Sequence, residues 1–371
     1  MNPLLVSPTA TCLRICLPPG YSDPGTQQGL EFIAKELAVL MGLREVKMVD
    51  SFRPEPGRRS YALPPQTLTR EQARALDIHS VADLYGGVVP HAFLVHKTAA
   101  HPLPEPGMAH PEGWQQALGL ALRKVVLPGF SVFNEKDALR ALSQLQEAGY
   151  KNLRAKLASA NAGRGQGVVA SRQDLERLLD QFEWRGQLQH GLVLEENLPY
   201  SHTFSVGQAD VGGSLLSYIG QQHATLNHLG EKVYGGSTLL AARGGYEQLL
   251  KVGVVQNARY LIDVAARYEH AFFSAFPGLY ASRRNYDVIL GINTQGVQKL
   301  GVLEHSWRCG GASVAEVLAL RTLQRNPHLS YTYAWTRERY VEQPDKARQS
   351  PYIYSLAPDH HGYLAKFGGP R

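Results

Sequence analysis

Two neighbouring apolar segments late in the chain each carry one acidic residue. Asp287 lies within residues 285–291, Glu304 lies within residues 301–311, and a turn-forming run at 293–296 separates them. The pattern predicts adjacent strands whose two carboxylates point at one metal ion. Because an unpaired carboxylate is costly to bury, ion pairing with arginine is the alternative to a metal. The arginines available for such pairs are Arg283, Arg284 and Arg308.

A lysine-bearing strand and a glycine-rich turn lie upstream of the acid pair. Glycines let backbone N–H groups approach phosphate oxygens, although the run matches neither the P-loop nor the dinucleotide-binding pattern. The turn alone fits a tight β-hairpin equally well. A strand lysine favours a nucleotide, whose α- and β-phosphates need a positive charge. The residues of this predicted phosphate site are Lys156, Gly163, Arg164, Gly165, Gln166 and Gly167.

The order of predicted elements divides the chain into four parts. A length of 371 residues exceeds the usual size of a single core. Alternating strands and helices in the first third predict a parallel sheet, and Asn134 and Ser171 are predicted to begin amphipathic helices further on. We expect an N-terminal α/β lobe, a lid subdomain, a metal-binding subdomain and a C-terminal tail. Their predicted ranges are 1–126, 127–196, 197–330 and 331–371.

Two further predictions concern the third part. Residues 220–245 are rich in Gly and His and are expected to form a long functional loop, since loops of that size inside a domain usually have a function. Together with the first lobe, this loop would select the substrate. Residues 246–276 are expected to form one helix.

Composition limits the class of partner. The net charge of +6, from 38 Lys and Arg against 32 Asp and Glu, suits an anionic small molecule but falls short of a nucleic-acid footprint. Three scattered cysteines indicate a reducing compartment. The sequence has no apolar run of the ~20 residues that a membrane span requires, and its start lacks the features of a secretory signal. We therefore expect a cytoplasmic protein without nucleic-acid or membrane partners.

The order of these parts, ending in D…E-x-x-x-R-x-G-G, resembles the ATP-grasp superfamily, which includes biotin carboxylase and D-alanine:D-alanine ligase. The chain looks most like an uncharacterised bacterial group described as biotin-carboxylase-like, and the resemblance covers about residues 127–323. It implies an α/β ATP-grasp fold, in which two α+β subdomains grip ATP, preceded by an open α/β lobe. It also implies ATP and Mg²⁺ as cofactors.

The resemblance assigns roles residue by residue. Lys156, with Lys124 as the candidate for a first phosphate lysine, would contact the phosphates, and residues 163–167 would close over them. Arg308 would face the reacting carboxylate, so Arg308 and Lys156 are the predicted catalytic residues. Glu195, Glu196 and Leu198 would line the adenine site. The implied metal ligands are Asp287, Glu304 and Ser306.

The implied reaction is ligation of a carboxylate to an amine or similar nucleophile through an acyl phosphate, with release of ADP and phosphate. The second hypothesis is a nucleotide-binding protein with reduced catalysis. It is motivated by Ser306, which replaces the family's Asn, and by the absence of a ribose-binding acid at 199–203. An acidic substrate would be held by arginine forks, with solvated surface arginines as the alternative. The candidates are Arg243, Arg283 and Arg284, and a homodimer is left open.

Overall fold

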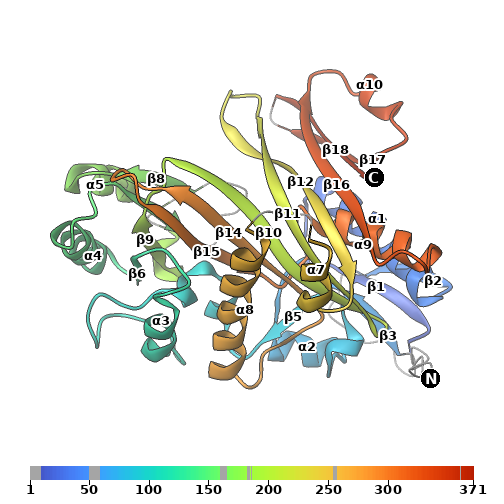
Figure 1. Cartoon of the computed structure of the whole chain (residues 1–371), viewed down its shortest axis with the longest axis horizontal. Helices are drawn as coiled ribbons and strands as arrows, with labels where there is room; N and C mark the ends of the chain where they lie inside the picture. The colour runs from blue at the N-terminus through green and yellow to red at the C-terminus, as the bar shows by residue number, and fades with distance from the viewer. Residues whose placement is uncertain are drawn as a thin grey trace.

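An eight-stranded antiparallel sheet runs through the centre of the molecule, in the order β15-β14-β10-β11-β12-β16-β18-β17 (Figure 1). The computed structural model describes residues 10–49, 59–158, 165–181, 184, 186–253, 257–359 and 361–371. The strands of the central sheet are β10 (Tyr200–Val211), β11 (Ser214–Leu226), β12 (Lys232–Arg243), β14 (Arg283–Ile292), β15 (Gln298–Ser306), β16 (Tyr331–Val341), β17 (Ile353–Asp359) and β18 (Gly362–Pro370).

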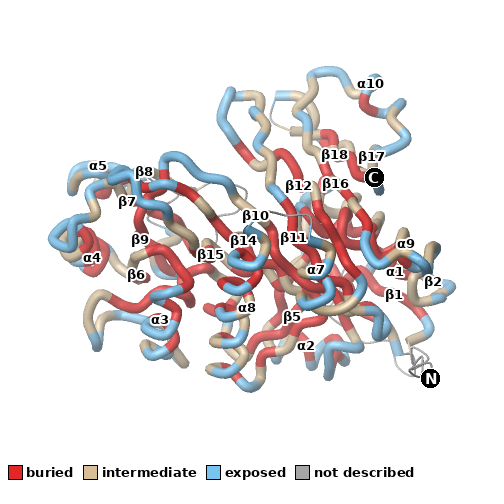
Figure 2. Tube along the Cα trace, in the orientation of Figure 1, coloured by how far each residue is buried: buried red, intermediate tan, exposed pale blue. Residues whose placement is uncertain are grey.

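Helices cover both faces of this sheet. On one face, α7 (Tyr246–Lys251) and α8 (Ala258–Ala275) bury an apolar cluster that includes Tyr286 and Val288 of β14. On the other face, α1 (Pro24–Met41) and α9 (Ser313–Arg325) pack against the half of the sheet that contains Ala209. Buried residues accordingly follow the middle of the strands (Figure 2). None of the helices in the described ranges has the length and hydropathy needed to cross a lipid bilayer.

The first lobe contains the parallel sheet that the sequence predicts. Strand β1 (Cys12–Cys16) pairs in parallel with β2 (Glu45–Val49) and β3 (Ser60–Leu63). Helix α1 begins at the side-chain cap of Asp23 and ends at Gly42, whose φ of 69° is the left-handed conformation that glycine favours. The remaining elements of this region are β4 (Leu68–Thr69), α2 (Arg70–Ala75), β5 (Gly87–Val89), α3 (Gln116–Leu122) and β13 (Tyr280–Ala281), with short 3-10 turns at Val81–Asp83, Ala92–Val95 and Lys97–Ala100.

A smaller lid unit stands at one end of the central sheet (Figure 1). Its antiparallel sheet has the order β6-β9-β7-β8 and is covered by α4 (Glu135–Glu147) and α5 (Arg172–Asp180). Asn134 caps α4 and Ser171 forms a capping box at α5, so both predicted helix starts are confirmed. The lid strands are β6 (Gly129–Val132), β7 (Leu153–Leu157), β8 (Gln166–Val169) and β9 (Leu192–Glu196), with a 3-10 turn at Leu188–His190.

Two sequence predictions about the central unit are wrong. Residues 220–245 do not form a long loop, because β11 and β12 pair along this segment as a hairpin. Its glycines permit close strand packing, since a Cβ at Gly220 would lie 2.5 Å from the Thr238 carbonyl oxygen. Residues 246–276 form the separate helices α7 and α8, and Gly253 between them has a φ of 68°. The segment 331–371, expected as a tail, supplies β16, β17 and β18 to the sheet, together with α10 (Asp345–Arg348).

Candidate functional site

The two predicted metal acids lie side by side on β14 and β15. Asp287 is the register partner of Glu304, and the register shifts directly after this pair, which leaves Leu303 without a ladder partner. Such a bulge re-aims the side chains of its strand. Leu303 packs against Ile289, which shares a strand face with Asp287 because alternate residues point the same way. The bulge therefore puts two acids and an apolar patch on one face.

Glu304 is surrounded by positive charge. Lys97 Nζ lies 2.8 Å from Glu304 Oε2, and the Lys97 side chain is 9% exposed. Burial raises the pKa of Glu304, but Lys97, and then Lys156 and Arg308, outweigh it and lower the pKa below its ordinary value. The electrostatic effect of Lys156 shows that this lid residue is close enough to Glu304 to influence its charge. The structure thus brings together charges that lie far apart in the sequence.

The pKa of Asp287 is shifted in the opposite direction from that of Glu304. Burial and repulsion from Glu304 raise its pKa to about 6, against the lowering effect of hydrogen bonds from Gln222 and Asn285. The described residues contain no group of three or more His, Cys, Asp or Glu side chains that would hold a metal without a substrate. Mg²⁺ typically uses one or two carboxylates together with substrate phosphates. Two repelling carboxylates fit this requirement, because a divalent cation would neutralise both.

Lys156 lies on β7, almost fully buried, in an ion pair with Glu195 of β9. His101 Nε2 lies 3.3 Å from the other oxygen of Glu195. Burial acts to raise the pKa of Glu195, but Lys156 and His101 lower it to about 2. Glu195, predicted to line an adenine site, is therefore bound to the predicted phosphate lysine in this structure.

Glu196 and Leu198 lie where the lid joins the central sheet. Glu196 Oε1 accepts a hydrogen bond of 2.8 Å from Asn293, whereas its buried Oε2 has no hydrogen-bond partner and lies 3.6 Å from Lys299 Nζ. Leu198 packs with Leu127 in the same small apolar cluster as the patch on β14 and β15. Because Glu196 Oε2 accepts no hydrogen bond from the described residues, it has the capacity to receive one from a planar base that carries donors.

The segment after β15 is held by Arg283. The guanidinium of Arg283 is 1% exposed, is paired with Glu316 and donates to the carbonyl of Ser306 at 3.0 Å. The Ser306 hydroxyl lies 3.3 Å from an Arg283 nitrogen and donates to the Arg308 carbonyl. Arg308 is half-buried, and one of its nitrogens donates to the Cys309 carbonyl. Arg308 therefore remains a candidate beside the acids, while Ser306 is occupied by protein partners.

The structure describes some, but not all, of the other residues predicted to bind phosphate. Gly163 and Arg164 lie outside the described residues. Gln166 is the ladder partner of Lys156, and its side-chain oxygen accepts from Arg154 at 3.0 Å. Gly165 has a φ of 59°, and Gly167 is backed closely by Leu178, so a Cβ there would collide. Lys124 is exposed at the end of α3.

The three arginines predicted to hold a substrate lie in different places. Arg243 is exposed at the end of β12 and donates to the Leu323 carbonyl near the end of α9. Arg284 binds Gln208 at 2.7 Å and lies 3.5 Å from Glu269 of α8. Arg283 is in the core, in the ion pair described above. The structure brings none of the three to the acid pair as an open guanidinium, so we leave all three out of the proposed substrate site.

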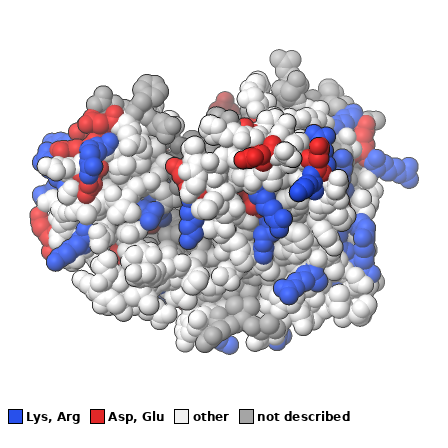
Figure 3. Space-filling model, turned by 90° about the horizontal axis from the view of Figure 1, so that it is seen from above, with Lys and Arg blue, Asp and Glu red and all other residues white. Residues whose placement is uncertain are grey.

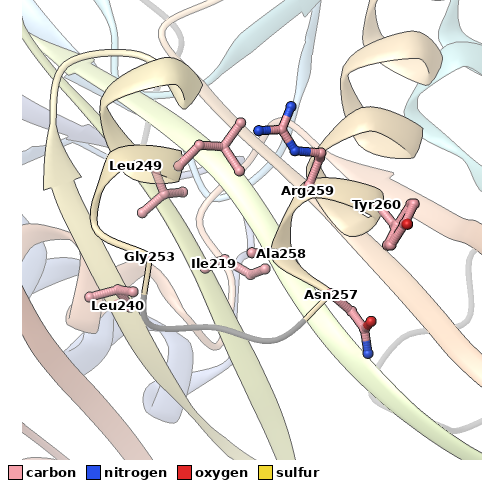
Figure 4. A pocket seen from close by; sticks show the side chains of 9 residues that line it. Ile219, Leu240, Leu249, Gly253, Asn257, Ala258, Arg259 and Tyr260 are labelled. Carbon is pink, nitrogen blue, oxygen red and sulfur yellow. The ribbon is translucent and has the colours of Figure 1, made fainter.

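A separate cavity of about 330 Å³ lies between α7 and α8 (Figure 4). Its lining includes Ile219, Leu240 and Leu249, which belong to the apolar cluster around Tyr286. Tyr286 and Asp287 are consecutive in β14 and therefore point to opposite faces of the sheet. The cavity is mainly apolar on its sheet side and contains none of the predicted site residues.

Charges of both signs are interspersed on the face seen from above, over the lid end and over the opposite end (Figure 3).

Three residues of the candidate site are not predicted from the sequence: Lys97, Ile289 and Leu303. Lys97 lies in a short 3-10 turn of the first lobe, where no strand or glycine pattern marks it. The two apolar residues look like ordinary core positions within a strand. A signal for Leu303 was present, because three consecutive apolar or small residues precede Glu304 and break strict alternation.

A family model described as "Protein of unknown function (DUF3182)" matches residues 21–368. No curated protein sequence matches the chain. Among solved structures, N5-carboxyaminoimidazole synthetase from Staphylococcus aureus, complexed with ADP, has a TM-score of 0.56 at 11% identity, covering 97% of this chain and 93% of that one. Biotin carboxylase from Campylobacter jejuni has a TM-score of 0.51 at 12% identity, covering 97% and 87%.

The biotin carboxylase domain of 2-oxoglutarate carboxylase from Hydrogenobacter thermophilus, in complex with MgADP, ADP and bicarbonate, has a TM-score of 0.53 at 13% identity, covering 96% and 86%. At these identities the likeness concerns the fold. The predicted ATP-grasp fold is therefore confirmed along almost the whole chain.

Proposed function

This chain belongs to the DUF3182 family and has the ATP-grasp fold, and from that premise we propose that it is an ATP-dependent ligase. In the proposed reaction, a substrate carboxylate oxygen attacks the γ-phosphorus of ATP, and the bond to the β-phosphate oxygen breaks to release ADP. An amine or similar nucleophile then attacks the acyl carbon and expels phosphate. The proton that the nucleophile loses passes to solvent.

The arrangement of charge around Glu304 is the observation that carries this proposal. Its carboxylate lies next to Asp287, 2.8 Å from Lys97, and within the electrostatic influence of Lys156 and Arg308. Two partly buried acids that repel each other are costly without a cation to share. Lys97 and Lys156 already have Glu304 and Glu195 as partners, and a bound polyanion would add to these contacts. A nucleoside triphosphate with Mg²⁺ supplies both.

Different residues would bind the metal, the phosphates and the substrate carboxylate. Asp287 and Glu304 would hold Mg²⁺, which when bound offsets charge on the phosphates. Lys97 and Lys156 would bind phosphate oxygens, and their fixed positions place charge where it develops during transfer. Arg308 would bind the substrate carboxylate, because its guanidinium can form two parallel hydrogen bonds with one carboxylate.

The base would lie at the junction of the lid and the central sheet. The apolar patch of Leu198, Ile289 and Leu303 offers a surface for a planar ring. The Glu196 oxygen that lacks a hydrogen-bond partner supplies an acceptor for an exocyclic amine. These features support adenine in this position and extend the predicted adenine site to β14 and β15.

Ser306 favours a second candidate function, a nucleotide-binding protein with reduced catalysis. Its hydroxyl is bonded to Arg308 and Arg283 rather than directed to the acids. Metal ligation would then rest on Asp287 and Glu304 alone. A protein of this kind would bind MgATP and act through lid movement or a partner.

Titration calorimetry with ATP, with and without Mg²⁺, tests the shared premise of both functions. We expect Mg²⁺-dependent binding that Asp287→Asn weakens at least tenfold. Measurement of ADP release with panels of carboxylates and amines then separates the candidates, since release that needs both an acid and a nucleophile supports the ligase. Binding without release across the panel supports the second candidate. Absence of ATP binding at millimolar concentration with Mg²⁺ would refute both.

A further inference from the structure

A buried ion pair lies on the same face of β14 as Asp287, four residues before it, and connects β14, α9 and β11 with the first lobe. Arg283 of β14 donates from Nε to Glu316 Oε2 of α9 at 3.0 Å, and a second guanidinium nitrogen binds Oε1. Both side chains are at most 1% exposed. Tyr85 of the first lobe donates to Oε2 at 2.7 Å, and Tyr218 of β11 lies 2.8 Å from Oε1. The carboxylate is thus surrounded by donors.

Two arms extend from this pair to the proposed site. The first runs from Arg283, which donates to the main-chain carbonyls of Ser306 and Arg308. The second runs from the Tyr218 hydroxyl, 3.0 Å from Asn285 Oδ1, and continues from Asn285 Nδ2 to Asp287 Oδ1 at 2.9 Å. One buried pair is therefore connected to a metal acid and to the turn that carries the arginine.

The direction of hydrogen bonding along the second arm follows from chemistry. An ionised Asp287 only accepts hydrogen bonds, so the amide nitrogen of Asn285 must face it and the amide oxygen must face Tyr218. The Tyr218 hydroxyl has one proton and three nearby acceptors: Glu316 Oε1 at 2.8 Å, Asn285 Oδ1 at 3.0 Å and the Arg284 carbonyl at 3.5 Å. The contact with the Glu316 carboxylate is the shortest and is charge-assisted, so the Tyr218 proton is shared between Glu316 and Asn285.

A glycine makes room for this arm. Gly207 of β10 is the ladder partner of both Tyr218 and Asn285. A Cβ at position 207 would collide with the Tyr218 hydroxyl. The missing side chain thus allows the tyrosine to reach across β10 to β14.

We infer that Tyr218 and Asn285 are positioning residues that hold the Asp287 carboxylate in its metal-binding orientation, with the Arg283–Glu316 pair as their anchor. The inference rests on the proposed function, because it assigns Mg²⁺ to Asp287. A buried ion pair often adds little to stability compared with apolar residues of the same size. Its fixed geometry is what the site requires, since residues that orient metal ligands typically contribute ten- to a hundredfold to metal affinity.

Two matched tyrosine variants test the inference. Tyr218→Phe and Tyr85→Phe each remove one hydroxyl from Glu316, but only the first breaks the arm to Asp287. The measurement is the Mg²⁺ concentration that gives half-maximal binding of a non-hydrolysable ATP analogue. We expect Tyr218→Phe to raise this concentration about tenfold or more, and Tyr85→Phe to change it less than twofold. Urea denaturation of both variants measures the structural loss that they share.

Asn285→Ala provides a second test that does not depend on Glu316. It should raise the half-maximal Mg²⁺ concentration at least tenfold and leave metal-free binding of the analogue within twofold of wild type. Equal Mg²⁺ requirements for the two tyrosine variants, or an unchanged requirement for Asn285→Ala, would overturn the inference. Wild-type protein that binds no analogue with Mg²⁺ would instead show that the proposed function fails.

Discussion

The Asp287→Asn variant should be more stable than the wild type in the absence of metal, although it binds metal less well. The substitution keeps the shape of the side chain and removes the charge that Glu304 repels. Burial and this repulsion raise the pKa of Asp287 from an ordinary value near 3.8 to about 6. At 1.36 kcal/mol per pKa unit, keeping the folded carboxylate ionised costs at most about 3 kcal/mol.

The expected gain is smaller than this upper value. Asp287 is partly exposed, so solvent screens part of the repulsion. We expect Asp287→Asn to raise the free energy of unfolding by about 1–2 kcal/mol at pH 8 without metal. Urea denaturation followed by circular dichroism measures the difference.

The pH dependence of this gain identifies its cause. Because the pKa is higher in the folded chain than in the unfolded chain, the native state binds the proton more tightly. The cost to the wild type is therefore complete above about pH 6 and absent below about pH 3.8. At pH 5 the gain from Asp287→Asn should fall to about half of its value at pH 8.

An exposed acid provides the control for the charge change itself. Asp263 on α8 is 61% exposed and lies 3.5 Å from Arg267. Asp263→Asn should change the free energy of unfolding by no more than about 0.5 kcal/mol at either pH. The reasoning is refuted if Asp287→Asn destabilises the protein at pH 8, or if its gain is the same at pH 5 as at pH 8.

Two further substitutions address the cations of the site. Glu195→Gln leaves Lys156 buried without its charged partner, so it should lower the free energy of unfolding, measured by urea denaturation, by about 3 kcal/mol at pH 7. The pKa of Glu195 falls from 4.5 to about 2 on folding, so the stabilisation is present above about pH 4.5 and is lost towards pH 2. A difference in stability between wild type and variant that stays constant in acid contradicts the ion pair. Lys97→Met should weaken Mg²⁺-dependent binding of an ATP analogue about tenfold or more, as measured by calorimetry. Arg243→Ala removes a positive charge outside the site and should leave the affinity unchanged. Equal affinities for the two variants would show that Lys97 is not part of the site.

The lid shows how much of the fold local sequence predicts. Asn134 and Ser171 begin α4 and α5 as expected, because a cap is made within one turn of its own helix. The parallel sheet of the first lobe follows from alternating strands and helices in the same way. These predictions depend on residues close together in the chain.

The hairpin of β11 and β12 shows where local sequence misleads. Its Gly and His residues resemble those of a loop, yet Gly236 has a φ of 117° and its missing side chain lets the carbonyl of Thr336 on β16 come close. That contact joins residues 100 positions apart (336 − 236). Only the order of strands in the sheet explains why glycine is placed there.

In the candidate site, too, the sequence predicts one part of the arrangement and tertiary structure sets the other. The sequence by itself determined that Asp287 and Glu304 lie on adjacent paired strands, because a short turn joins the two strands. The register set at this turn would place Leu303 opposite Asp287, and the bulge seen in the structure brings Glu304 there instead. Tertiary structure decided which cations meet these acids: it placed Lys97 of the first lobe against Glu304 and withdrew Arg283 into an ion pair with Glu316. Contacts of that kind depend on how separate elements pack, and no spacing along the chain encodes them.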